Sequence, residues 1–251
     1  MDLSEAPATV IRRHPWEVAR LDFFRRRLAA HGLDRRALEI LDVGSGDAWL
    51  AMALLPALHA DTRITCWDAA YDEGLMRELA RQGGQRVHFV ATPPSERFDL
   101  ALLLDVLEHI ENDEVFLRGV VERNLRAGGQ VLISVPAWRV LFGDHDVQLH
   151  HFRRYQPGEA VSLLERCGLK IVSRGGLFHS LLVPRVVEKL AARLGLLRTP
   201  PPNAGEWSAG SLVTSTVEGA LKLDGRLSSL LSRGKLSLPG LSWWALCVKR
   251  S

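Results

Sequence analysis

Two short segments of the chain concentrate residues that could exchange protons with a bound molecule. The first runs from Asp105 to His109 and has acids at its first and fourth positions. The second contains His151, Arg154 and Tyr155. A carboxylate or an imidazole can take a proton from an acceptor group, and a guanidinium can bind an acidic group of the substrate. We therefore predict Asp105, His109 and His151 as catalytic residues.

The remaining polar residues of these segments are predicted to bind substrate. They are Glu108, Arg154 and Tyr155. A structural interpretation stays open for each, in which acids at the start of a helix act as caps or dipole partners. In the second segment, Arg153 and Arg154 could pair with Asp144 or Asp146 to order a loop, with Tyr155 packed beneath it.

The first segment also has the residue types of a metal site. Carboxylate oxygens and an imidazole can bind Mg²⁺, Mn²⁺ or Zn²⁺, and His150 or His151 could add a ligand. Such clusters are more often structural. The expectation is therefore no resident metal, with Asp105, Glu108 and His109 as the candidates for a divalent ion.

A glycine-containing turn predicts a binding site for a nucleotide-like molecule. Gly44 and Gly46 lie directly after an apolar run, where glycine lets the backbone approach a ligand. Asp68 follows the next apolar run, 22 residues beyond Gly46, where an acid can accept hydrogen bonds from ribose hydroxyls. Trp49 occupies the third glycine position of a dinucleotide fingerprint, and no Gly-Lys-Ser/Thr sequence of a P-loop occurs.

The elements that must position these residues alternate between strand and helix from Leu38 onward. Apolar β-type runs predict strands at 39–43, 63–67, 87–90, 98–104, 130–135, 169–173 and 241–248. Helices are expected over 15–31, 48–58, 72–81, 113–126 and 157–167, with two more between 181 and 237. This order predicts an α/β fold with a parallel sheet, and both reactive segments follow strands, so they belong at the carboxyl edge where ligands bind.

At the glycine turn the sequence resembles the class I S-adenosylmethionine-dependent methyltransferases. Asp42, Gly44, Gly46 and Ala48 match their first motif, acidic-x-Gly-x-Gly-x-Gly/Ala, position by position. The resemblance continues through 98–100, 105–109, 125–129 and 133–137, and covers about residues 38–178. It implies a Rossmann-like seven-stranded sheet, mostly parallel with an antiparallel last strand, and S-adenosyl-L-methionine as the cofactor.

The same resemblance implies roles for individual residues. The cofactor would be bound by Asp42, Gly44, Ser45, Gly46, Asp68, Leu104 and Asp105, with Thr92 the side-chain candidate for the adenine. Residues 105–109 resemble the acidic-x-x-Glu-His element of ubiquinone-pathway O-methyltransferases and of small-RNA 2′-O-methyltransferases, where it holds a divalent metal. Residues 146–155 resemble an Asp-x-x-x-x-His-x-Arg-Arg-Tyr element of many such enzymes.

These resemblances predict methyl transfer to a small-molecule or lipid- or sugar-linked acceptor, at oxygen. An RNA methyltransferase and a non-catalytic cofactor-binding scaffold are the alternatives. Nucleic acid is not expected as the partner, because a net charge of +3 over 251 residues is weak. No apolar run approaches the ~18 residues of a membrane span, and three separated cysteines suggest neither disulfides nor structural zinc. The expected location is the cytoplasm.

The basic residues are unevenly distributed. Eight arginines face three acids between residues 11 and 36, and four basic residues face one acid between 181 and 198. Arg185, Lys189 and Arg193 share one face of a predicted helix whose other face is apolar, a pattern typical of helices that lie on anionic membranes. It is also typical of a helix packed on its own domain. Peripheral contact with the inner membrane face therefore stays open.

Four segments are expected along the chain. Residues 1–36 would form a helical lid, 37–180 the cofactor-binding core, 181–237 a helical cap insertion, and 238–251 a final strand returning to the core sheet.

Overall fold

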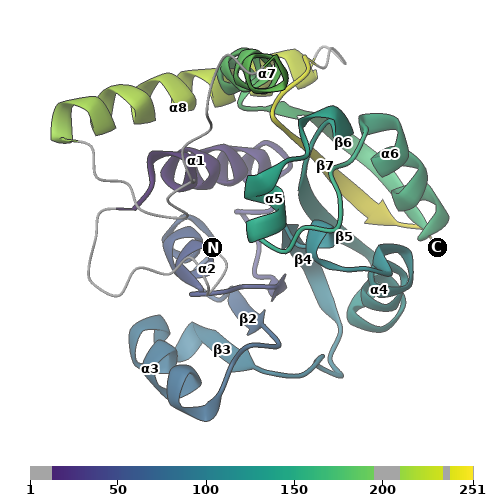
Figure 1. Ribbon diagram of the computed structural model, residues 1–251. Coiled ribbons are helices and arrows are strands. Elements are labelled where there is room, and N and C mark those ends of the chain that lie inside the picture. Colours follow the sequence, from purple (N-terminus) through teal and green to yellow (C-terminus); the bar gives the residue numbers. More distant parts are fainter. Residues whose placement is uncertain (1–12, 195–209, 234–237, 251) are drawn as a thin grey trace.

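A seven-stranded sheet forms the centre of the molecule (Figure 1). The computed structural model describes residues 13–194, 210–233 and 238–250. The strands are β1 (Glu39–Val43), β2 (Arg63–Trp67), β3 (Val87–Val90), β4 (Phe98–Leu104), β5 (Leu125–Pro136), β6 (Leu169–Leu177) and β7 (Ser242–Lys249). Their order is β3-β2-β1-β4-β5-β7-β6, and only pairings of β7 are antiparallel. The predicted sheet is thus confirmed.

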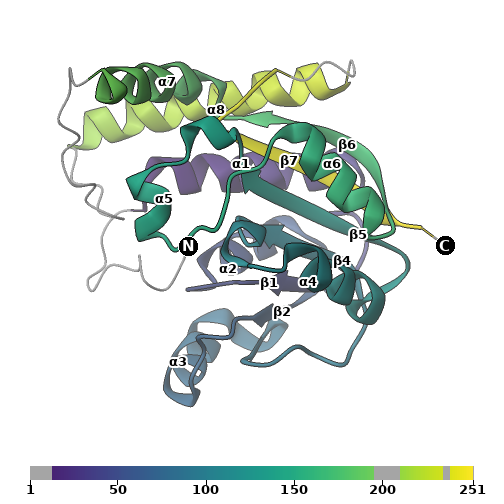
Figure 2. The same ribbon diagram turned by 45° about the vertical axis from the view of Figure 1, so that its right-hand side comes forward.

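Helices cover both faces of this sheet (Figures 1 and 2). They are α1 (Pro15–Ala30), α2 (Trp49–Leu54), α3 (Glu73–Gly83), α4 (Asp113–Gly119), α5 (Asp144–Gln148), α6 (Pro157–Arg166), α7 (His179–Arg193) and α8 (Ser211–Arg233). One apolar cluster joins α1, α2, α3 and α8 to the sheet, and a second joins α4 and α6 to its opposite face. Such double covering explains why the strands are nearly continuous apolar runs.

Three element boundaries differ from the sequence prediction. The helix expected over 48–58 is α-helical only to Leu54, where a 3-10 turn (Leu55–Ala57) follows. The helix expected over 113–126 ends at Gly119, a π-helical turn (Val120–Asn124) follows, and β5 already begins at Leu125. Pairing of Leu125 with Phe98 across the sheet lengthens the strand at this end. The strand expected over 169–173 extends to Leu177 because Gly176 lets β6 pass close to neighbouring backbone. A Cβ there would lie 2.3 Å from the carbonyl oxygen of Leu238.

The N-terminal helix is part of the main apolar core. Phe23, Phe24 and Leu28 of α1 are buried in the same cluster as Leu221 of α8. The Phe23 ring meets Trp244 of β7 edge to face, with ring centroids 5.2 Å apart. The burial of these aromatic side chains fixes α1 beside α8 on one face of the sheet (Figure 2).

The expected helices between 181 and 237 are α7 and α8. The Pro-rich break expected between them, residues 200–205, lies outside the described residues, as do residues 1–12 of the expected N-terminal segment. Within the described ranges, none of the helices combines the length and apolar character needed to cross a bilayer.

Candidate active site

The glycine turn follows β1 and meets the acid that follows β2. Gly44 and Gly46 have φ of +64° and +54°, the left-handed region that favours glycine. A Cβ on Gly44 would lie 2.9 Å from Cγ2 of Val106, so this approach of two loops excludes a side chain. The backbone N–H of Gly46 donates to Oδ2 of Asp68 over 2.8 Å. The two predicted cofactor elements therefore lie together.

Two further residues of this motif are buried beneath the turn. Burial, together with the nearby negative charges of Asp68 and Asp47, raises the pKa of Asp42 to about 7. The Ser45 hydroxyl lies 2.8 Å from the hydroxyl of Tyr71, a residue that the sequence analysis did not single out. Of the other predicted cofactor residues, Leu104 ends β4 against the core, and the adenine candidate Thr92 is exposed after β3.

Asp105 begins the loop after β4 and is paired with the N-terminal helix. Its backbone has φ of +57°, an uncommon conformation for a residue with a side chain. Oδ2 lies 2.8 Å from Nη1 of Arg20, and Oδ1 accepts from the Ser134 hydroxyl over 2.7 Å. Arg20 was missed because nothing in the local sequence connects α1 to residues 85 positions away.

The second reactive segment is organised around the buried carboxylate of Asp146. Its Oδ1 accepts from Nε of Arg154 over 2.8 Å and lies 3.0 Å from Nδ1 of His151, while Oδ2 accepts from the Gly143 N–H. Although burial opposes ionisation, the hydrogen bonds from His151 and Arg154 hold the pKa of Asp146 at about 2. With Nδ1 facing this anion, Nε2 is the ring nitrogen left to face a reactant.

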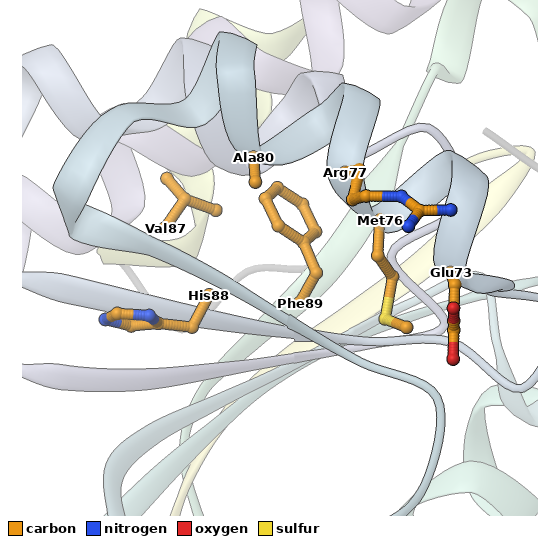
Figure 3. A pocket seen from close by; sticks show the side chains of 7 residues that line it. All are labelled: Glu73, Met76, Arg77, Ala80, Val87, His88 and Phe89. Carbon is orange, nitrogen blue, oxygen red and sulfur yellow. The ribbon is translucent and has the colours of Figure 1, made fainter.

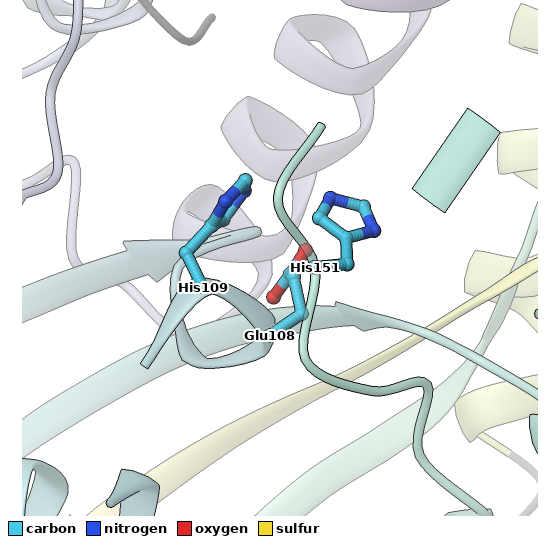
Figure 4. Close-up of side chains that lie close together, drawn as sticks. All are labelled: Glu108, His109 and His151. Carbon is cyan, nitrogen blue, oxygen red and sulfur yellow. The ribbon is translucent and has the colours of Figure 1, made fainter. Parts of the chain in front are cut away.

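Glu108 lies between two histidines where the two predicted segments meet (Figure 4). One ligand atom from each of Glu108, His109 and His151 lies within 4.8 Å of the others, and the histidine ring centroids are 4.6 Å apart. Both carboxyl oxygens of Glu108 are buried and find no hydrogen-bond partner among the described residues. Burial, and secondarily the charge of Asp105, raises the pKa of Glu108 well above its ordinary value.

This cluster revises the expected donor set. Asp105 was a candidate ligand with Glu108 and His109, but its carboxylate is engaged by Arg20 and Ser134, and His151 completes the group instead. A buried carboxyl group without partners is what a divalent cation could satisfy. The three groups therefore fit such an ion chemically.

Arg154 and Tyr155, predicted to bind substrate, are instead engaged within the protein. Arg154 is buried against Asp146, and the Tyr155 hydroxyl donates to Oδ2 of Asp113 over 2.6 Å. Burial and this carboxylate raise the pKa of Tyr155. Arg153 also pairs with Asp113, at 3.2 Å. The contacts of Arg154 and Tyr155 agree with the structural interpretation, in which Arg154 pairs with Asp146 and Tyr155 packs beneath the loop. Arg153 differs from it, because its partner is Asp113.

Several arginines of the N-terminal segment are engaged within the protein, whereas Arg25, Arg35 and Arg36 are exposed. Besides the Arg20 pair, Arg26 holds Asp22 through its Nε at 2.8 Å. Arg27 is buried, and its guanidinium lies 5.6 Å from the ring centroid of Trp244. Much of this charge is used to fasten α1, which weakens the argument for an RNA-binding face.

A separate hollow of about 400 Å³ lies between α3 and the edge strand β3 (Figure 3). Its lining residues are Glu73, Met76, Arg77, Ala80, Val87, His88 and Phe89. None of these residues was predicted to belong to the site. The candidate active site is therefore the sheet edge that carries the glycine turn, Asp105 and His151, and not this hollow.

Comparison with known proteins gives a consistent assignment. The family model described as a methyltransferase domain matches residues 15–174. A ubiquinone biosynthesis O-methyltransferase from Paramagnetospirillum magneticum is 36% identical over 189 residues, covering 65% of this chain and 75% of that protein. The residues that the family model matches include α1, both reactive segments and most of β6.

Solved structures share the fold. A putative sarcosine dimethylglycine methyltransferase from Galdieria sulphuraria has a TM-score of 0.57 at 18% identity, covering 92% of this chain and 85% of that one. The N-methyltransferase NodS from Bradyrhizobium japonicum, in complex with S-adenosyl-L-homocysteine, has a TM-score of 0.54 at 13% identity, covering 100% and 95%. At these identities the likeness concerns the fold alone.

Proposed function

Because the chain belongs to the methyltransferase-domain family and is a class I S-adenosylmethionine-dependent methyltransferase, we propose that it methylates an oxygen atom of a small-molecule or lipid- or sugar-linked acceptor. The observation that carries this proposal is the His151 imidazole, which is held by Asp146 at 3.0 Å on the sheet edge that also bears the glycine turn. The choice of oxygen is supported by the relatives named ubiquinone O-methyltransferases.

The cofactor part of the proposal rests on residues that fit its polar groups. The glycine turn leaves no room for a Cβ at Gly44, and Asp68 stands beside it with a carboxylate that can accept from ribose hydroxyls. Asp42, Ser45, Gly46, Leu104 and Asp105 complete the proposed set. When bound, S-adenosylmethionine supplies a methyl carbon on a sulfonium, so that much of the catalysis is positioning of the acceptor.

A hydroxyl acceptor must lose its proton, and the side chains of the protein must remove it. We assign its removal to Nε2 of His151, while the Nδ1–H group keeps its proton and donates a hydrogen bond to Asp146. The anion then stabilises the imidazolium as it forms, as carboxylates paired with histidine do elsewhere. Asp146 is therefore proposed as a positioning residue. His109, whose ring contacts that of His151, and Asp105 remain proposed parts of the site.

A divalent ion is an alternative to this base. Glu108, His109 and His151 would hold it, and its charge would favour the ionised form of an acceptor oxygen. It would occupy the same ring nitrogen of His151 that the proton needs, so the two arrangements exclude each other. Metal titration, described in the Discussion, distinguishes them.

The segment boundaries remain part of the proposal. We retain residues 1–36 as an N-terminal helical lid segment, 37–180 as the cofactor-binding core, 181–237 as a helical cap insertion and 238–251 as the final strand returning to the core sheet. We also propose that the protein is cytoplasmic and makes peripheral contact with an anionic membrane. Such contact would bring the candidate active site to a lipid-linked acceptor.

The direct test is incubation of the purified protein with methyl-labelled S-adenosylmethionine and fractionated host extract. We expect label in a lipid or small-molecule fraction, transferred by the wild type and not by His151→Gln. His88→Gln on the exposed β3 strand is the matched control and should transfer normally. Label in RNA together with salt-sensitive RNA binding would favour the RNA alternative, and cofactor binding without any transfer would favour the scaffold.

A further inference from the structure

Helix α7 exposes its apolar face to solvent. Val183, Val186, Val187, Leu190 and Leu194 follow one another at helical spacing along α7 and its C-terminal end, and all five side chains are exposed, Val183 by 67% and Leu194 by 72%. An amphipathic helix packed on its own domain would turn this stripe inward. The stripe is therefore available to something outside the described chain.

Helix α8 carries a second stripe of the same kind. Leu212, Leu223, Leu227 and Leu230 are exposed, whereas Leu221, on the opposite side, is buried against the core with α1. The two helices lie side by side along the upper edge of the molecule in both views (Figures 1 and 2), and the Ser180 hydroxyl donates to Asp224 across them over 2.9 Å. Adjacent apolar stripes of this length are uncommon on a soluble surface without a partner.

Two cations of α7 are engaged by neighbouring groups of the protein. Arg185 pairs with Glu188 at 2.8 Å, and Nζ of Lys189 donates to the carbonyl oxygen of Phe142. The exposed side chains show that the aliphatic side of the helix faces outward.

The two helices nevertheless keep a positive balance. Their sequences hold six basic residues against three acidic ones. Each of those three acids is engaged within the described residues: Glu188 by Arg185, Glu218 by Lys222, and Asp224 by Ser180. A surface of exposed aliphatic side chains with a net positive charge and no unpaired acid is complementary to anionic lipid.

We propose that the outward stripes of α7 and α8 form a docking surface for an anionic lipid bilayer. Aliphatic side chains would enter the boundary between headgroups and acyl chains, and the net charge would add attraction at the surface. Further exposed apolar side chains lie in the chain segment around Phe142, which Lys189 contacts, and on toward His151: Val140, Val147 and Phe152. Docking through α7 would thus hold the candidate active site near the lipid phase.

Cosedimentation with vesicles tests the docking surface without any methyl acceptor or cofactor. A negative result would therefore contradict the docking proposal and leave the proposed methyltransferase function unaffected. The probes are vesicles of phosphatidylcholine with and without phosphatidylglycerol. We expect the wild-type protein to bind the anionic vesicles. The double variant Leu190→Glu/Leu223→Glu should bind at least about tenfold more weakly, because each carboxylate replaces an apolar side chain that would be buried in the lipid boundary and also repels anionic headgroups.

Val115→Glu is the matched control, since Val115 is 73% exposed on α4, away from both stripes. It should bind vesicles like the wild type, and circular dichroism with thermal unfolding should show that all variants are folded. Absence of vesicle binding by the wild type would overturn the proposal, as would equal loss in both variants. A wild-type dimer that the double variant converts to a monomer, without vesicle binding, would instead identify the stripes as an interface between copies of this chain.

Discussion

Arg20 of α1 places its Nη1 atom 2.8 Å from Oδ2 of Asp105, the residue that opens the loop after β4. The same guanidinium reaches the Ser134 hydroxyl of β5 at 3.3 Å, and Ser134 in turn donates to Asp105. A helix at the start of the chain thereby fixes a carboxylate at the carboxyl edge of the sheet. The Asp105 carboxylate is thus held by Arg20 and Ser134, and its proposed contribution to the site depends on these two contacts.

Replacing Arg20 by Ala should destabilise the protein by about 1–3 kcal/mol, because it leaves a mostly buried carboxylate without its charged partner. Chemical denaturation measures this free energy. Arg25→Ala is the control, since Arg25 is exposed and its nearest acid, Asp22, is 3.8 Å away; we expect a change below about 0.5 kcal/mol there. Equal effects in both variants would mean that the Arg20 pair contributes nothing special.

Asp68→Ala should weaken cofactor binding, and Gly46→Val should abolish it. The first change removes the carboxylate proposed to hold the ribose, and the second adds a β-branched side chain where φ is +54°. Isothermal calorimetry with S-adenosylmethionine measures both. Asp61→Ala, on the exposed turn before β2, is a suitable control. Wild-type affinity in either site variant would show that the cofactor lies elsewhere.

His151→Gln should lower kcat by about 10²–10⁴-fold while leaving cofactor affinity unchanged, because it removes the proposed base alone. Asp146→Asn should lower kcat in the same direction, since a neutral amide cannot stabilise an imidazolium. Single-turnover kinetics with the identified acceptor, together with calorimetry, separate chemistry from binding. Full turnover by both variants would remove His151 from the mechanism.

Asp42 should make stability depend on pH. Its folded-state pKa of about 7 lies above the value of about 4 expected for an unfolded chain. Between these values the folded protein binds more protons, so its free energy of unfolding should fall as the pH rises, by at most about 1.4 kcal/mol per pH unit from this group.

Asp42→Asn should remove that part of the decline. Glu108 contributes a decline of the same sign and is retained in the variant, so the informative quantity is the difference between the two denaturation profiles from pH 4 to 7. A difference that does not change with pH would mean that Asp42 ionises normally in the folded protein.

Divalent cations provide the test of the Glu108 cluster. If His151 acts as the base, Mg²⁺ and Mn²⁺ should leave the thermal unfolding midpoint unchanged, and a chelator should leave activity unchanged. A cation that bound the folded state would instead raise the midpoint by mass action. A rise in the wild type that is absent from Glu108→Gln would assign Glu108, His109 and His151 as ligands.

The sequence by itself determined the order of strands and helices and the positions of the residues with reactive groups. Periodicity of two or of 3.6 residues is local information, and so is the glycine turn after β1. The end of α4 and the start of β5 were misjudged, because pairing of Leu125 with Phe98, a contact between distant segments, decides where the strand begins.

Only the tertiary structure decided which charges meet. Arg20 and Asp105, and likewise the residues of the Glu108 cluster, come from separate segments that only the folded sheet brings together. The pair of Arg154 with Asp146 lies within one segment and was among the pairings that the sequence left open. The same holds for α7, where the sequence predicted an amphipathic helix but could not tell which side faces outward. A helical pattern determines which residues share a face, whereas the packing of the rest of the chain determines where that face points.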